Sequence, residues 1–186
     1  MSVRAFIAVD LKRDEKIEAF AAALKDADPT LKVVDPSQIH VTLKFLGDTD
    51  EKMISQIAEA MRDAAKGIDA FRISLKGAGS FPGKNRIRVI WVGMNDTLPL
   101  GTIATRLDEG LSALGIEREA RPFAPHLTVA RAKFEGPHPT LRQIIENHRE
   151  ADFGEQEIAA VRLKKSVLTR CGPEYSTLEE VVLPTR

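Results

Sequence analysis

Two short stretches of this chain share one pattern, and that pattern limits the folds the chain can adopt. The stretch HVTLKFLG occupies residues 40–47, and the stretch HLTVAR occupies residues 126–131. In each, a histidine is followed two places later by a threonine, and an apolar residue stands between them. Residues two apart in a β-strand point to the same face. Each stretch therefore predicts a strand that buries its apolar residues in a core and presents one imidazole and one hydroxyl on its other face.

The segments around the two stretches follow a similar order, which indicates a weak internal duplication. In each half a helical pattern precedes the histidine strand, a second helical pattern follows it, and further strands come after. The expected helices cover residues 13–28, 48–67, 98–115 and 139–150, and the expected strands cover residues 4–11, 40–47, 71–77, 86–93, 126–132, 158–168 and 175–183.

Residues that favour helix ends and turns support several of these boundaries. Pro29 stops the first helix, and Asp48 and Glu51 are spaced as a capping box for the second. Gly67 stands at the end of that second helix. The stretch GAGSFPGKN is expected to be a loop between two strands, and CGPE a turn between the last two.

Helices and strands are mixed along the chain without a regular βαβ alternation, so the expected class is α+β, with antiparallel sheets covered by helices. The duplication predicts a two-lobed, pseudo-symmetric arrangement in which the sheets line a central cleft and the helices lie outside. No linker-like or low-complexity stretch divides the sequence. We therefore expect residues 1–186 to form a single two-lobed domain.

The composition excludes several classes of protein. With 43% apolar and 29% charged residues, the chain resembles an ordinary globular protein. Its 27 basic and 27 acidic residues balance, which argues against non-specific coating of nucleic acid but permits a basic patch around a pocket. A single cysteine, Cys171, excludes an internal disulfide and favours a reducing compartment. Without a signal-peptide layout or a membrane-length apolar stretch, the chain is expected to be cytoplasmic with no membrane association. We also expect a monomer.

Two imidazoles that face one another across a cleft suit a reaction that needs one general acid and one general base, because the ordinary histidine pKa is about 6.5. The hydroxyls of Thr42 and Thr128 can donate hydrogen bonds to an anion held between His40 and His126, and a phosphate fits this symmetry.

Two cations, Lys44 and Arg131, follow the histidine–threonine pairs and could supply positive charge to a phosphate. In an ideal strand Lys44 shares the face of His40, whereas Arg131 points away from the face of His126. Arg131 therefore needs a bulge or a strand end to reach the phosphate.

Other chemistries have little support in the sequence. No histidine or cysteine spacing typical of a metal site is present, and His138 and His148 stand beside charged segments. Cys171 has no histidine near it in the sequence, and no nucleophile elbow occurs. We expect no metal and no cofactor.

Beyond these two stretches, the sequence resembles one family over nearly its whole length. The resemblance rests on the segments RAFIAVDL, HVTLKFLGD, GSFPGKNRIRVIWVG, RPFAPHLTVAR and SVLTRCGPEYSTL. Together they are similar to the RNA 2′,3′-cyclic phosphodiesterases, also known as 2′-5′ RNA ligases, of the two-histidine phosphoesterase superfamily. The resemblance implies a metal-independent enzyme that opens a 2′,3′-cyclic phosphate at an RNA end and leaves a 2′-phosphate.

The resemblance also implies roles for residues. His40 would be the proton donor to the leaving 3′ oxygen, His126 the proton acceptor that activates water, and Thr42 and Thr128 the phosphate-holding groups. The near-symmetry of the two stretches means that the sequence alone does not establish which histidine has which role. Reversal of the same chemistry would give 2′-5′ ligation.

The roles of several further residues have more than one interpretation. Phe81 and Tyr175 could stack on a base, although Phe81 is as well explained as a loop anchor. Trp91 is expected in the core or the cleft wall, and Arg121 either steers phosphate or is an ordinary surface residue. Lys164 and Lys165 are expected at a solvated strand edge.

Two other functions remain open from the sequence. One is a phosphodiesterase for a small cyclic phosphate, such as a cyclic nucleotide or ADP-ribose cyclic phosphate. The other is a non-catalytic module that binds RNA ends, whose mark would be the loss of one histidine or threonine from the pairs. Neither is lost here.

Overall fold

The computed structural model describes residues 1–169 and 172–185, so Cys171 lies outside the described residues. It contains two antiparallel sheets and four α-helices, which confirms the α+β class. The first sheet has the strand order β3–β1–β8–β9 and the second the order β2–β6–β5–β4–β7. The strands are β1 (Ser2–Asp10), β2 (Lys32–Val33), β3 (His40–Asp50), β4 (Phe71–Gly83), β5 (Arg86–Asn95), β6 (Leu127–Gly136), β7 (Asp152–Ile158), β8 (Ala160–Thr169) and β9 (Gly172–Val182).

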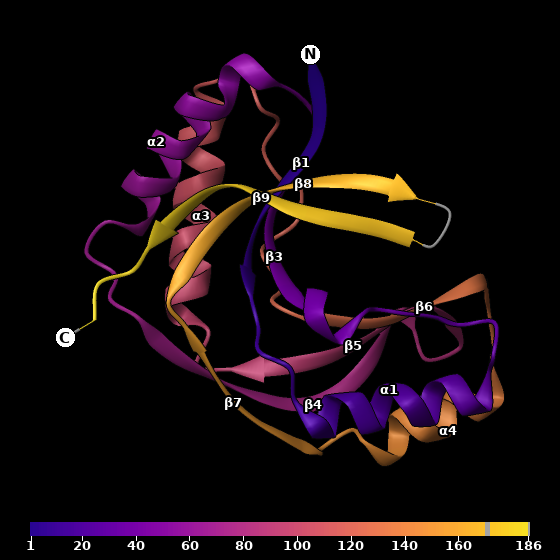
Figure 1. The fold of residues 1–186 in the computed structure, drawn as a ribbon. Helices are drawn as coiled ribbons and strands as arrows, with labels where there is room; N and C mark the ends of the chain where they lie inside the picture. The colour runs from indigo at the N-terminus through magenta and orange to yellow at the C-terminus, as the bar shows by residue number, and fades with distance from the viewer. Residues whose placement is uncertain (170–171, 186) are drawn as a thin grey trace.

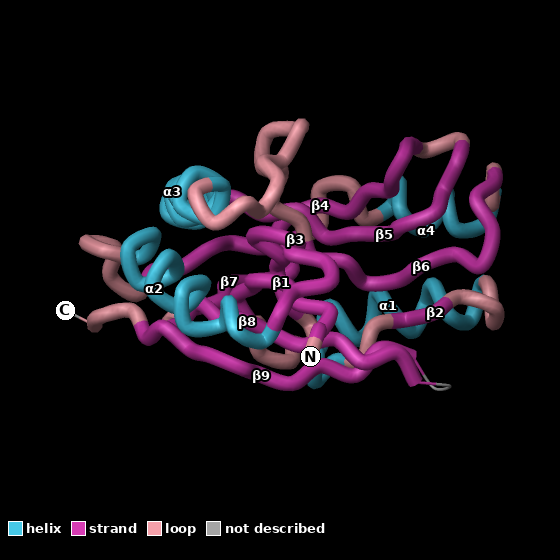
Figure 2. The backbone as a smooth tube through the Cα atoms, turned by 90° about the horizontal axis from the view of Figure 1, so that it is seen from above, coloured by secondary structure: helices cyan, strands magenta, loops and turns pink. Residues whose placement is uncertain are grey.

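The helices lie on the outside of the two sheets (Figure 1), where α2 contacts α3 and α1 contacts α4. Seen from above, α2 and α3 lie at one end of the molecule and α1 and α4 at the other, with the strands between them (Figure 2). The helices are α1 (Glu15–Ala27), α2 (Ile54–Ala65), α3 (Leu98–Ser112) and α4 (Pro139–Asn147), and two short 3-10 turns, η1 (Pro36–Gln38) and η2 (Glu51–Met53), precede β3 and α2.

The first helix forms for the reasons that its sequence indicates. Asp14 caps α1 by accepting hydrogen bonds from the backbone N–H groups of Lys16, at 2.8 Å, and Ile17, at 3.2 Å. The apolar residues that recur at helical spacing are buried: Ile17, Phe20, Ala21 and Leu24.

The expected start of the second helix is wrong. Strand β3 continues to Asp50, which pairs with Ser2, so Asp48 is held in an extended strand and cannot cap a helix. Instead Asp50 accepts a hydrogen bond from the backbone N–H of Lys52 at 3.1 Å and begins the 3-10 turn η2. Helix α2 therefore starts later than its periodic pattern suggests, at Ile54.

The expected loop over residues 77–85 is also wrong, because β4 runs on through most of it to Gly83. Gly79 pairs with Trp91 on β5, and a Cβ atom built at Gly79 would lie 2.2 Å from the indole Cζ2 atom. This glycine therefore serves to make room for the indole on the sheet rather than to turn the chain. Two strands, β2 and β7, were not expected.

The two lobes repeat one arrangement, as the duplication predicts. Each histidine strand is paired in antiparallel fashion, β3 with β1 and β6 with β5. Strands β3 and β6 belong to different sheets yet contact one another. The fold thus brings the two histidine stretches together at the boundary between the lobes.

Candidate functional site

The two histidines are held in the same way. His40 begins β3, and its Nδ1 atom lies 2.8 Å from the carbonyl oxygen of Gln38. His126 directly precedes β6, and its Nδ1 atom lies 2.9 Å from the carbonyl oxygen of Ala124. A carbonyl oxygen can only accept, so in both rings Nδ1 carries the hydrogen. Nε2 is then the nitrogen of each ring that can exchange a proton with a ligand.

Aromatic rings fix the orientation of both imidazoles. The ring of Tyr175 meets His40 edge to face, with centroids 5.2 Å apart and planes at 86°. Phe81 meets His126 in the same manner, at 5.1 Å and 86°. Phe81 also packs on Trp91, at 5.4 Å. Phe81 is therefore a support for His126, and Tyr175 a support for His40, which favours the anchoring role considered for Phe81 and gives Tyr175 a place in the site.

A bulge interrupts each histidine strand at the same position of the repeated phrase. On β3, Thr42 pairs with Ala8 and Lys44 with Ile7, which leaves Leu43 as the extra residue. On β6, the same break in register falls between Thr128 and Ala130 and leaves Val129 as the extra residue. The extra residue and its successor are buried in both strands, Leu43 with Lys44 and Val129 with Ala130.

The bulges reverse the alternation of faces from that point on. Phe45 lies across from Phe6, and the Phe6 ring is 5.0 Å from the His40 ring, so Phe45 shares the face of His40. By the same shift Arg131 shares the face of Thr128. The bulge that Arg131 requires is therefore present. The positive charge of Arg131 acts to lower the pKa of both His40 and Tyr175, which belong to the other lobe.

The expected face of Lys44 is wrong, because the bulge turns it away from His40. Its side chain is only 2% exposed, and Nζ donates to Asp108 Oδ1 on α3 at 2.7 Å and to the carbonyl oxygen of Glu117 at 2.6 Å. Lys44 thus ties the sheet to α3 and is not placed to meet a ligand beside His40.

The expected strand-edge position of Lys164 is also wrong. Strand β8 lies between β1 and β9, and Lys164 is buried with Nζ 2.5 Å from Asp10 Oδ1. Asp10 also pairs with Arg162, at 3.2 Å. Asp10 stands across from His40 in the β1–β3 register, so this charged cluster adjoins the His40 imidazole. The neighbouring Lys165 is half-buried on the same interior strand.

This environment changes the acidity of His40. Its pKa is lowered from the ordinary value, chiefly because burial disfavours the charged ring. The positive charges of Lys164 and Arg131 act in the same direction, while the hydrogen bond to Gln38 and the charge of Asp10 oppose them. Burial also raises the pKa of the neighbouring Tyr175.

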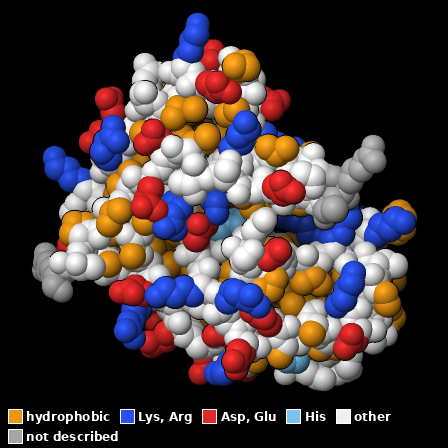
Figure 3. All heavy atoms as spheres, viewed as in Figure 1, with side chains coloured by type: hydrophobic (Ala, Val, Ile, Leu, Met, Phe, Trp, Pro, Cys, Tyr) orange, Lys and Arg blue, Asp and Glu red, His pale blue; other side chains and the backbone are white. Residues whose placement is uncertain are grey.

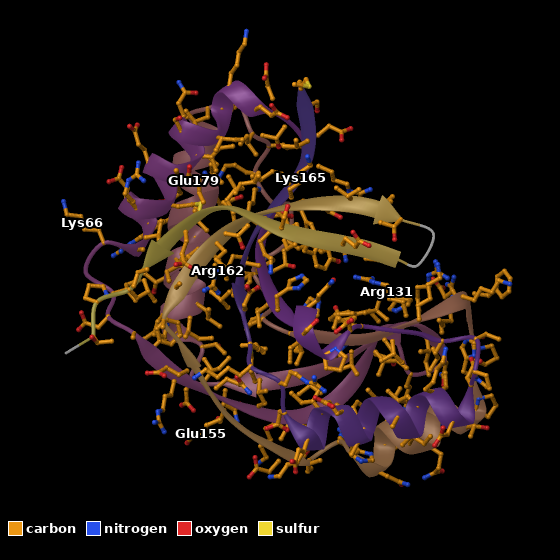
Figure 4. The ribbon with its side chains drawn as sticks, viewed as in Figure 1. Lys66, Arg131, Glu155, Arg162, Lys165 and Glu179 are labelled. Atoms are coloured by element: carbon orange, nitrogen blue, oxygen red, sulfur yellow. The ribbon has the colours of Figure 1, made fainter. Side chains whose placement is uncertain are left out.

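The surface is hollowed between the two lobes, and a histidine side chain with Lys and Arg side chains around it is visible there (Figure 3). We call this hollow the cleft. Arg131 lies between β6 and the strands β8 and β9, and Arg162 belongs to the opposite sheet (Figure 4). Aromatic rings lie beside both histidines, Phe6 and Tyr175 at His40 and Phe81 at His126, and the charged cluster of Asp10, Arg162 and Lys164 adjoins His40.

Within residues 1–169 and 172–185, no group of three or more histidine, cysteine, aspartate or glutamate side chains is arranged to hold a metal ion. In the same part of the chain, no helix has the length and apolar character needed to span a membrane. Arg121 is exposed in the loop before β6.

Sequence reasoning missed two residues near His40, Asp10 and Phe45, and misplaced a third, Lys164. Strict alternation from His40 assigns Phe45 to the core, where its apolar ring fits, so no local signal distinguishes it. Asp10 and Lys164 are recognisable only once β1 and β8 are known to be neighbours.

Comparison with known proteins agrees with the repeated architecture. The family model described as LigT like Phosphoesterase matches the chain twice, over residues 9–91 and 92–175. The chain is 36% identical over 181 residues to a protein of Methanothermobacter thermautotrophicus called RNA 2′,3′-cyclic phosphodiesterase, covering 96% of this chain and 98% of that one. A protein of the same name from Methanocaldococcus jannaschii is 37% identical over 180 residues, with 96% and 99% covered.

Solved structures show the same fold. A crystal structure of a Thermus thermophilus protein superposes with a TM-score of 0.78, at 30% identity and 97% coverage of both chains. The structure of E. coli LigT complexed with 3′-AMP superposes with a TM-score of 0.75 over the full length of both chains, although only 22% of residues are identical. The double match of the family model and the identity to relatives along nearly the whole chain lead to one conclusion: this chain belongs to the LigT-like phosphoesterase family.

Proposed function

We propose that this chain hydrolyses RNA 2′,3′-cyclic phosphate ends to 2′-phosphate ends, with His40 and His126 as the acid and base and without a metal ion. The observation that carries the proposal is the matched pair of hydrogen bonds from Nδ1 to the carbonyl oxygens of Gln38 and Ala124. It gives both rings the tautomer in which Nε2 can exchange a proton. The relatives that match nearly the whole length of this chain carry the name of this activity.

Each histidine transfers one proton in the proposed reaction, and one bond to phosphorus forms while another breaks. His126 Nε2 accepts a proton from a water molecule as the water oxygen forms a bond to phosphorus. The bond between phosphorus and the ribose 3′ oxygen breaks, and His40 donates a proton to that oxygen. The bond from phosphorus to the 2′ oxygen is retained, so the product carries a 2′-phosphate. With an RNA 5′-hydroxyl in place of water, the same forward steps would form a 2′-5′ link: the 5′ oxygen bonds to phosphorus, the bond to the 3′ oxygen breaks, and the bond to the 2′ oxygen is kept.

Three further groups hold the phosphate in this proposal. The hydroxyls of Thr42 and Thr128 donate to its non-bridging oxygens, and Arg131 offsets its charge. The lowered pKa of His40 is compatible with a donor role, because a bound phosphate beside Nε2 stabilises the charged imidazolium. Binding of the substrate thus favours the proton-bearing form of His40.

The test is incubation of the purified protein with a short RNA that ends in a 2′,3′-cyclic phosphate, with the product end group identified by mass spectrometry and phosphatase sensitivity. Replacement of His40 or His126 by alanine should lower turnover on the order of 10²–10⁴-fold. His138→Ala is the matched control, because His138 also bonds a backbone carbonyl, that of Phe134, outside the two repeated stretches.

The outcomes separate the open functions. Near wild-type turnover in either His40→Ala or His126→Ala would refute paired histidine catalysis. Faster hydrolysis of a 2′,3′-cyclic mononucleotide or of ADP-ribose cyclic phosphate than of the RNA would make a small molecule the substrate. Tight binding of the RNA end without turnover would indicate a binding module. The single cysteine of the chain favours a reducing compartment, the cytoplasm, as the place of the reaction.

A further inference from the structure

The two repeated lobes differ in the residues that stand beside their histidines. Asp10 on β1 lies across from His40, and the Nζ atom of Lys164 on β8 is 2.5 Å from its Oδ1 atom. Arg162, on the same strand as the lysine, lies 3.2 Å from Asp10 Oδ2. The Lys164 side chain is only 8% exposed, so the sheet keeps this ion pair largely away from bulk solvent.

The strand registers identify the equivalent position on β5 in the other lobe. The residue across from the threonine of the repeated phrase is Ala8 on β1 and Trp91 on β5. Two residues further along these strands stand Asp10 and Gly93, respectively. A Cβ atom built at Gly93 would lie 2.8 Å from the carbonyl oxygen of Lys76, so the packing leaves no room for a side chain there. The His126 lobe therefore has no counterpart of the carboxylate.

The next strands along differ in the same way. Arg162 on β8 pairs with Ala8, and Gly79 on β4 pairs with Trp91, so these two residues occupy equivalent positions. Two residues further along stand the buried lysine of the ion pair on β8 and Phe81 on β4. If the sheet itself required charged groups at these positions, both lobes would contain them. The acid and its two cations therefore have a cause that is specific to the His40 lobe.

Asp10 differs in sign from the other charges that act on the His40 ring within the described part of the chain. Lys164 on β8 and Arg131 on β6 act against a charged imidazole, and Asp10 on β1 acts in its favour. Tyr175 on β9 meets His40 edge to face and lies 5.9 Å from Lys164 Nζ, and because burial raises the pKa of its phenol, this group is neutral near neutral pH. The carboxylate is therefore the group among these neighbours that helps His40 to hold a proton.

We propose that Asp10 is a positioning residue for the reaction: its carboxylate, held by the two cations of β8, balances the positive charge beside His40, so that this imidazole carries the proton that the leaving oxygen receives. The inference rests on the proposed function and goes beyond it, because it gives the near-symmetric site a physical cause for unequal roles. A negative charge beside an imidazole favours the charged form, which a general acid needs. The equivalent glycine supplies no such charge to His126, as suits a ring that begins neutral and accepts a proton.

The first measurement is the pKa of His40, followed by NMR of the ring Cε1–H groups, with His40→Ala to assign the signal. Asp10→Asn should lower this pKa, because the negative charge is lost, and Lys164→Met should raise it, because the carboxylate then acts without its opposing cation. Asp10→Asn leaves a buried lysine without its partner and could fail to fold. The double variant Asp10→Asn/Lys164→Met avoids this problem and differs from Lys164→Met only in the charge at residue 10. Its His40 pKa should be lower than that of Lys164→Met.

The second measurement is the pH profile of kcat/KM on the cyclic-phosphate RNA. A general acid reacts only when it is protonated, so at pH values above the pKa of His40 each unit by which that pKa falls should lower kcat/KM by up to about tenfold. Above neutral pH, Asp10→Asn should therefore lose activity and Lys164→Met should gain it, and both differences from wild type should narrow as the pH falls. A merely structural role would lower the activity of both variants at every pH.

Lys44→Met is the matched control. Lys44 is also a buried lysine of this sheet that is paired with an aspartate, but its side chain points away from the cleft. The control should leave the pKa of His40 and the pH profile unchanged, and circular dichroism verifies that each variant is folded. Equal His40 pKa values in Lys164→Met and the double variant would overturn the proposal, and so would losses of kcat/KM in the two single variants that do not depend on pH.

The NMR titration requires no turnover, so this inference and the proposed function can fail separately. If the wild-type protein hydrolyses no cyclic phosphate, the proposed function fails, while the expected order of His40 pKa values still supports the charge balance that Asp10 provides. If the wild-type protein hydrolyses the RNA and the pKa of His40 does not respond to the charge at residue 10, the positioning role fails and the proposed function stands.

Discussion

The buried contact between Lys44 and Asp108 gives the sharpest test of how the first lobe is held together. Asp108 is 18% exposed and accepts hydrogen bonds from Lys44 at 2.7 Å, from the Glu119 backbone N–H at 2.9 Å and from Arg118 at 3.1 Å. Burial alone would raise the pKa of Asp108, but these bonds outweigh it and lower the pKa to about 2. At 1.36 kcal/mol per pKa unit, the native contacts favour the charged carboxylate by about 2 kcal/mol.

Asp108→Asn and Lys44→Met should have unequal effects on the free energy of unfolding. Asp108→Asn removes the nearer counter-charge and leaves the buried Lys44 ammonium with the partly exposed Glu119 carboxylate, 3.6 Å away, as its acidic neighbour. Breaking a buried ion pair in this way costs up to about 3–5 kcal/mol. Lys44→Met removes the buried cation itself, and Asp108 keeps its bonds to Arg118 and Glu119. We therefore expect the lysine variant to lose clearly less stability than the aspartate variant.

Urea unfolding at pH 7, followed by the fluorescence of Trp91, measures both values, because the chain contains one tryptophan. A loss in Lys44→Met equal to or greater than that in Asp108→Asn would refute the reasoning, since the buried charge would not be the cause. Lys44→Met should also retain wild-type turnover of the cyclic-phosphate RNA, because its side chain points away from the cleft. If that folded variant lost turnover, Lys44 would have to contribute to substrate binding after all.

The same pair predicts a pH dependence. The folded-state pKa of Asp108 lies below its unfolded value of 3.8, so its contribution is fully present above that pH and is lost as the pH falls toward about 2. The stability difference between wild type and Asp108→Asn should therefore narrow below about pH 4. A difference that stayed constant down to pH 2 would contradict the assigned contacts.

Three further predictions concern the reaction. The pH profile of kcat/KM should be bell-shaped, because one imidazole must be charged and the other neutral, and a rate that only rises with pH would contradict paired imidazoles. Burial and the charge of Lys164 lower the pKa of His40, so Lys164→Met should raise the apparent pKa that belongs to His40. Thr42→Ala and Thr128→Ala should each lose about 1.5–3 kcal/mol of transition-state stabilisation, measured as kcat/KM. Thr42→Ser and Thr128→Ser should retain most activity, because the hydroxyl is kept. If serine fails as badly as alanine, packing of the threonine methyl group in the sheet is the requirement instead. Activity should persist after dialysis against EDTA with metal content measured, and loss that one added metal restores would recast the histidines as ligands.

The elements of the fold could be predicted where local patterns decide them. The helix over residues 15–27 needs only its spacing of apolar residues and the Asp14 cap, and both are visible in the sequence. The start of α2 could not be read in this way, because the pairing of Asp50 with Ser2 extends β3 into the expected helix. The continuation of β4 past Gly77 has a similar cause, since β5 supplies the partner that keeps the glycine-rich segment extended.

The residues around the cleft likewise fall into those that a local pattern predicts and those that depend on which strands are neighbours. Trp91 was expected in the core or the cleft wall, and it lies across from Thr128 on the cleft face. Lys164 has the sequence surroundings of a strand-edge residue, yet the order β3–β1–β8–β9 places it in the interior of a sheet. Its ion pair with Asp10 joins residues more than a hundred positions apart, a contact that no local pattern contains.

The sequence by itself determined the two histidine–threonine strands, the helices around them and the duplication that sets them in equivalent places, because each of these follows from side-chain periodicity within a single segment. Only the tertiary structure decided which way Lys44, Phe45 and Arg131 point. Their directions depend on the bulges at Leu43 and Val129, and a bulge is a property of two paired strands. The partner strands β1 and β5 lie far from β3 and β6 in the chain, so one residue of slip between them reverses the faces of the side chains that follow.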